Sequence, residues 1–158
     1  MLKWLLIAAA ALPLLAVLAG QFGLLRGKAP DNLGVHDGKL KPPSKTPNSV
    51  SSQAAAWPQH PQAAQAAIEP LAPVGDGPAT MARLRAIVEA TPGATVIKSE
   101  ADYLYATFST RVMKFTDDVE FWWDGRVVQV RSASRLGRRD FDVNRHRIEA
   151  IRAQLQAR

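Results

Sequence analysis

The sequence predicts an α+β fold: an antiparallel β-meander of about four strands packed against two helices, preceded by an N-terminal transmembrane or signal helix. Three observations predict it. A long apolar run follows Lys3, a Pro- and Ser-rich stretch comes next, and strand-like runs then lie between two stretches of helical periodicity. We therefore divide the chain into a membrane anchor or signal segment (1–26), an extended strap partly packed on the domain (27–67) and an α+β domain (68–158).

The first segment is apolar from Trp4 to Gly20, close to the roughly 20 residues that span a bilayer as a helix. Val17-Leu18-Ala19 also fits a signal-peptidase site, although the run is longer than most signal peptides carry. We expect a bacterial-type inner-membrane protein with its domain outside the cytoplasm. The alternative is a periplasmic or secreted protein after signal cleavage.

Residues 27–67, the strap, are interrupted by prolines that block long helices and central strands. Their composition alone is typical of a flexible spacer between membrane and domain.

Beyond the strap, helical spacing of apolar residues predicts helices over 78–90 and 142–156, the second capped by Asp142. Between them, strand-like runs cover residues 95–99, 103–109, 119–123 and 126–133.

The pair Asp124-Gly125 favours a two-residue hairpin turn, which would place Phe121 opposite Val128 and Asp118 opposite Arg131. Because side chains alternate along a strand, one face is apolar and is expected to lie against the helices. The other face carries polar and aromatic side chains: Tyr103, Tyr105, Asp118, Glu120, Trp122, Gln129 and Arg131. This face is either an ordinary solvated surface or a binding platform whose aromatic rings supply contact area.

A second polar group lies around the start of the last helix. Asn144 shares that helix's apolar face, which predicts a buried network with Ser132 and Asp117. The alternative is an anion site built from Arg135, Arg145 and the free amides of the helix N-terminus.

Composition excludes several functions. The net charge is +6, but after Arg111 arginines alternate with acids, which disfavours nucleic acid as a partner. The absence of cysteine excludes disulfides and thiolate chemistry. Metal-ligand spacings and nucleotide fingerprints are also missing from the sequence, so we predict no metal, no cofactor and no catalytic residues.

Several blocks in order resemble the domain-of-unknown-function family numbered 1499. They are Leu33-Gly34-Val35, Asp37-Gly38, Pro47 to Gln53, Asp117 to Phe121, Val130 to Gly137 and Val143 to Ile148. The resemblance implies that residues 47–53 pack on the sheet. Family members often carry cysteines where this chain has Pro43 and Ser49, so a bridge there is absent. The family brings no established activity to carry over.

We therefore expect a membrane-tethered accessory module that binds a small anionic ligand, a lipid headgroup or an envelope protein. The alternative is a hydrolase centred on Ser132, Ser134 or the strand 117–120. No Gly-x-Ser-x-Gly motif is present, and His146 is predicted to face solvent.

Overall fold

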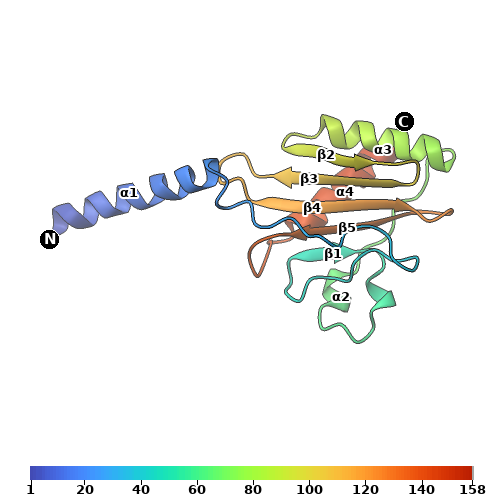
Figure 1. Cartoon of the computed structure of the whole chain (residues 1–158), viewed down its shortest axis with the longest axis horizontal. Coiled ribbons are helices and arrows are strands. Elements are labelled where there is room, and N and C mark those ends of the chain that lie inside the picture. Colours follow the sequence, from blue (N-terminus) through green and yellow to red (C-terminus); the bar gives the residue numbers. More distant parts are fainter. Residues whose placement is uncertain (158) are drawn as a thin grey trace.

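The structure is a computed structural model that describes residues 1–157, apart from the side chains of Leu2, Leu6, Ile7, Ala8 and Ala10. An α+β domain stands at one end of helix α1 (Leu2–Gln21) (Figure 1). Among the described residues, five antiparallel strands form one sheet in the order β1-β5-β4-β3-β2. Their bounds are β1 Ser49–Ser51, β2 Ala94–Ser99, β3 Tyr103–Ser109, β4 Thr116–Trp123 and β5 Val128–Ser134. The predicted class and the antiparallel sheet with helices are confirmed.

The fifth strand, β1, comes from the strap and was missed. It pairs antiparallel with β5, placing Val50 opposite Ser132. Two short helices, η1 (Ala54–Ala56) and α2 (Ala63–Ala66), follow it. With only three residues beside a proline-rich stretch, β1 has too little periodicity to be recognised without its partner strand.

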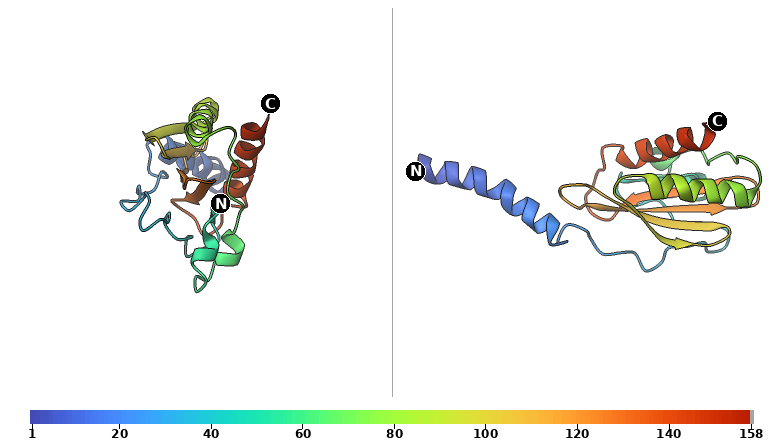
Figure 2. Two further views of the ribbon diagram at one scale, coloured as in Figure 1. Left: turned by 90° about the vertical axis from the view of Figure 1, so that its right-hand side faces the viewer. Right: turned by 90° about the horizontal axis from the view of Figure 1, so that it is seen from above.

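Helices α3 (Gly77–Ala90) and α4 (Val143–Gln156) occupy one side of the sheet, close to their predicted positions (Figure 2). The predicted cap of α4 is wrong. Asp142 adopts a left-handed backbone (φ 63°) and makes no capping bond, whereas Asp140 Oδ2 accepts from the Asn144 amide at 3.0 Å. A left-handed residue directs its side chain away from the first helical amides, and the neighbouring aspartate takes its place.

The core lies between the sheet and these two helices. Phe121 and Val128 are fully buried there, as the alternation predicted. The rest of the cluster is Val50, Ile68, Leu71, Met81, Leu84, Val88, Leu104, Ala106, Phe108, Val119, Val130, Ile148, Ile151 and Leu155.

The predicted hairpin register is wrong by two residues, because the loop holds four residues rather than two. Phe121 lies opposite Val130, and Trp123 opposite Val128. Asp124 closes the wider loop: its Oδ1 accepts from the amides of Arg126 (2.9 Å) and Val127 (3.0 Å). An aspartate that bonds the following amides replaces the tight turn. A shift of two leaves every side chain on its predicted face.

The strap crosses the opposite face of the sheet, seen in blue below the strands in the right panel of Figure 2. Leu40, within the strap, is buried. Gln53 fixes the strap's turn, because its side chain accepts from the Leu40 amide at 2.8 Å and donates to the Gly38 carbonyl at 3.1 Å. Helices therefore cover one side of the sheet, and irregular chain covers β4 and β5 on the other.

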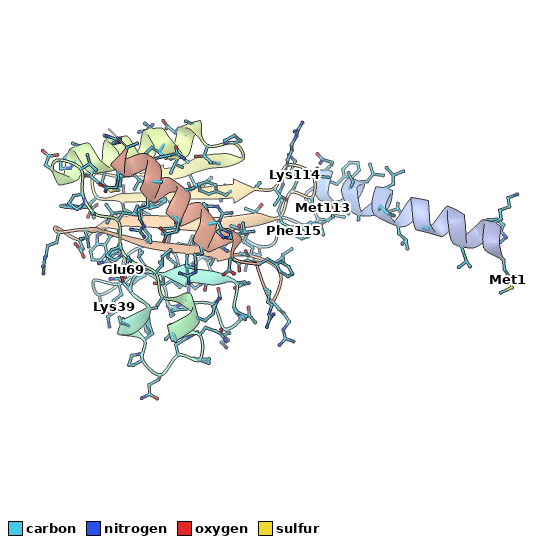
Figure 3. The ribbon with its side chains drawn as sticks, turned by 180° about the vertical axis from the view of Figure 1, so that it is seen from behind. Met1, Lys39, Glu69, Met113, Lys114 and Phe115 are labelled. Atoms are coloured by element: carbon cyan, nitrogen blue, oxygen red, sulfur yellow. The ribbon has the colours of Figure 1, made fainter. Side chains whose placement is uncertain are left out.

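Helix α1 contacts the domain only near its C-terminal end among the described side chains. A Cβ at Gly20 would lie 2.5 Å from the Met113 carbonyl oxygen, so glycine permits a close approach to the β3–β4 loop (Figure 3). Gln21 also donates to the Val112 carbonyl at 2.7 Å. Within the described residues, no helix reaches the combined length and apolar character needed to cross a bilayer.

Candidate functional site

The polar face of the sheet carries a closed set of ion pairs under the strap. Arg135 binds Asp118 through two bonds, Nε to Oδ2 at 2.9 Å and Nη2 to Oδ1 at 2.7 Å. Tyr105 donates to the same carboxylate at 2.6 Å. Burial, followed by this hydrogen bond, raises the pKa of Tyr105 to about 12. The expected Asp118–Arg131 pair is absent from this set, because the register shift places Ala133 opposite Asp118.

Glu120 lies opposite Arg131 in the middle of this face and is fully buried. Its Oε1 accepts from the Gly34 amide of the strap at 2.7 Å and from the Tyr103 hydroxyl at 2.8 Å. Its Oε2 is 3.9 Å from Arg131 Nη1 and, among the described residues, makes no hydrogen bond. Burial raises the pKa of Glu120, partly opposed by the Gly34 bond and by Arg131.

Arg131 is buried as well, and its Nε donates to the Pro42 carbonyl of the strap at 3.2 Å. Burial lowers the pKa of Arg131. Most of the face predicted to be a solvated surface or an open platform is therefore a buried ionic layer. Sequence alternation showed that the face was polar, but it could not show that another segment would cover it.

Trp122 keeps partial exposure, as do Tyr105 and Gln129 on the same face. With Tyr103 it lines a cleft of about 530 Å³ that also includes Glu100, Asp102 and the strap. Among the described residues, no group of three or more His, Cys, Asp or Glu side chains is placed to hold a metal ion.

On the helix side, Asn144 joins α4 to the sheet. Its Nδ2 donates to Ser134 Oγ at 3.1 Å, to Asp140 Oδ2 at 2.7 Å and to the Asn48 carbonyl at 3.1 Å. The Ser132 hydroxyl bonds Asn144 Oδ1. Arg147 completes the network: it donates to Asn144 Oδ1 at 2.7 Å and to Asp117 Oδ2 at 2.6 Å. The predicted buried network of Asn, Ser and Asp is thus present, with an arginine that the sequence reading had not assigned to it.

The alternative anion site at the start of α4 is not assembled. Arg145 donates to the Ala67 carbonyl at 3.0 Å and the Gln65 carbonyl at 2.8 Å, while Arg135 lies on the strap side with Asp118.

The structure does not support the serine-hydrolase alternative either. His146 is exposed as predicted, and within residues 1–157 no hydrogen bond joins it to Ser132 or Ser134.

Residues 39–155 match the family model described as "Protein of unknown function (DUF1499)". The chain belongs to this family. The matched region begins inside the strap and ends in α4, so the DUF1499 domain includes β1, the buried ionic layer and the Asn144 network. No curated protein and no solved structure matches the chain.

The structure has a further feature that the sequence analysis missed, here named the basic cleft. It has a volume of about 660 Å³, and its lining includes Arg26, which follows α1, and Lys114 of the β3–β4 loop that α1 approaches. Four cationic side chains line it: Arg26, Arg111, Lys114 and Arg135. Hydroxyl groups of Thr95, Thr107, Ser109 and Thr116 also line it, and no carboxylate appears among its described lining residues.

Three of these cations carry uncompensated charge. Arg135 is paired with Asp118, whereas among the described residues no ion pair involves Arg26, Arg111 or Lys114. Since like charges gathered without counter-charges attract anions, the cleft is suited to a phosphate, sulfate or carboxylate group. Its four cations come from three separate segments of the chain, so no local motif could have indicated the cleft.

Proposed function

We propose that this protein is a membrane-tethered binding module of the DUF1499 family that holds a small anionic group in the basic cleft. The observation that carries the proposal is the convergence of Arg26, Arg111 and Lys114 on one cleft without a carboxylate. Hydroxyl donors at its wall, such as Thr107, would orient the bound oxygens. This role requires no catalytic residue.

The tether is α1. Its outward side chains are apolar and exposed, among them Leu12, Leu14 and Trp4, which is 71% exposed. Exposed apolar area of this kind favours transfer to a lipid phase. The close contact of Gly20 with Met113 joins α1 to the domain, which favours a retained anchor over a cleaved signal. Intact mass of the membrane-extracted protein tests this: loss of residues 1–19 would exclude the retained anchor.

Ligand binding is tested on the full chain in detergent micelles, by following the thermal unfolding midpoint with inorganic phosphate and pyrophosphate. We expect pyrophosphate to raise the midpoint, because ligands that bind only the folded state stabilise it. Arg111→Gln should weaken pyrophosphate affinity by about tenfold, the usual loss of one charge-assisted hydrogen bond.

The matched control is Arg85→Gln, which removes an exposed cation of α3 that does not line the cleft. It should leave pyrophosphate affinity unchanged. A midpoint that neither anion moves, or an equal loss of affinity in both variants, would refute anion binding in the basic cleft.

A further inference from the structure

Two loops at the end of the domain beside α1 expose apolar side chains. They are the β3–β4 loop (110–115) and the β5–α4 loop (135–142), here called the α1-side loops. Their exposed apolar residues are Val112, Phe115, Leu136 and Phe141, and Val143 follows directly. Both loops adjoin the chain leaving α1. Gly20 approaches Met113, and a Cβ at Gly27 would lie 2.7 Å from the Arg135 Cβ and 3.0 Å from the Leu136 Cγ.

The backbone of these loops is strained in a way that core packing does not explain. Phe141 has φ 52° and is 85% exposed, Asp142 has φ 63°, and Lys114 has φ 57°. A left-handed conformation is a true outlier for a bulky residue and costs on the order of 1 kcal/mol or more. Here it holds a large aromatic ring away from the domain.

The same loops carry cations next to their apolar tips. Arg138 and Arg139 are exposed beside Phe141, and Lys114 precedes Phe115. The carboxylates in the second loop are Asp140 and Asp142, and Asp140 is engaged by Asn144. Aromatic rings at the level of the headgroups, with cations beside anionic lipids, are the pattern of a bilayer interface.

We propose that the α1-side loops dock on an anionic bilayer surface, with Phe141 and Phe115 in the interface and Arg138 and Arg139 on headgroup phosphates. The inference rests on the tether proposed above. Helix α1 projects from this same end of the domain (Figure 1), so a bilayer that holds α1 faces these loops. Docking would also bring the basic cleft against the lipid surface, since Lys114 belongs to both the cleft and a loop.

Because the chain has no cysteine, single cysteines can report on docking in the full chain. An environment-sensitive fluorophore is attached at Phe141→Cys and, with Phe141 intact, at Val143→Cys. The control is Arg126→Cys, at the exposed hairpin at the far end of β4. Each protein is bound to vesicles of brominated phosphatidylcholine with or without phosphatidylglycerol, and binding is verified by flotation.

Docking predicts quenching by brominated chains at Phe141→Cys and Val143→Cys in phosphatidylglycerol vesicles, but not at Arg126→Cys. Each arginine at an anionic lipid surface changes the ratio of docked to undocked protein about fivefold. Introducing both Arg138→Ala and Arg139→Ala into the labelled proteins should therefore lower that ratio by about 25-fold. Flotation with equal quenching at all three sites overturns docking and leaves the tether standing. Failure of every variant to float overturns both. Pyrophosphate binding in micelles reports on the basic cleft independently of either result.

Discussion

The two faces of the sheet bury side chains of different chemistry. The helix side buries apolar side chains such as Phe121 and Val130, with the Asn144 network at one end. The strap side buries Glu120, Arg131 and Asp118 beneath irregular chain. Apolar burial is non-directional and tolerates many partners, whereas a buried charge is stable only if specific groups reach it. The helix side therefore supplies stability, and the strap side makes that stability depend on individual bonds and on pH.

The largest test of this contrast compares two neighbouring aromatic residues on opposite faces. Phe121→Ala should lower the free energy of unfolding by about 4 kcal/mol, because it opens a cavity in a fully buried site. Trp122→Ala, one residue along and half-buried, should lower it by clearly less. Urea unfolding of both variants in micelles, followed by circular dichroism, measures the difference. Equal losses would mean that the strap side is packed as tightly as the core.

The next effect concerns the ionic layer. Glu120→Ala should destabilise the domain by about 3 kcal/mol, because it leaves the Arg131 guanidinium, the Gly34 amide and the Tyr103 hydroxyl without their shared partner. Glu120→Gln should cost less, since an amide oxygen still accepts from the Gly34 amide and the Tyr103 hydroxyl. The same urea series gives both values. If Gln proves as costly as Ala, the negative charge rather than hydrogen bonding holds the strap.

A smaller expected effect is a difference between the two faces in how the free energy of unfolding depends on pH. The pKa of Glu120 is raised in the folded state. Its favourable contribution to the free energy of unfolding is therefore complete below the ordinary glutamate pKa of about 4.3. That contribution is lost as the pH rises through the pKa of Glu120 in the folded protein. The unfolding free energy of the wild type minus that of Glu120→Gln should therefore fall across this window, by at most about 1.4 kcal/mol per pH unit. Phe121→Ala should keep the wild-type pH dependence. A flat difference would contradict a raised pKa.

The smallest expected effect is spectroscopic and involves the chain's two tyrosines. Burial raises the pKa of Tyr105 to about 12, and burial and Glu120 raise that of Tyr103 further. Ultraviolet absorbance should show almost no phenolate at pH 10.0, the ordinary tyrosine pKa, whereas the urea-unfolded chain should be about half ionised there. Early ionisation of the folded protein would mean that the strap does not shield this face.

Much of the fold was predictable because its signals are local. The stripes of Leu84 in α3 and Ile148 in α4 follow helical spacing, and alternation assigned Phe121 to the core despite the register error. That error came from Asp124, whose carboxylate bonds two loop amides and widens the turn. Which loop forms depends on such side-chain bonds, which the residue pair Asp-Gly does not specify.

The sequence by itself determined helices α3 and α4, the strands of the meander, the direction of their side chains and membership of the DUF1499 family. The tertiary structure alone decided that the strap would bury Glu120, that Asp118 would pair with Arg135, and that Arg26, Arg111 and Lys114 would meet in one cleft. The physical reason is the sequence separation over which each kind of interaction acts. Backbone periodicity acts between residues a few positions apart, whereas burial of a charge or assembly of a cleft depends on segments that are distant in the chain and become neighbours only on folding.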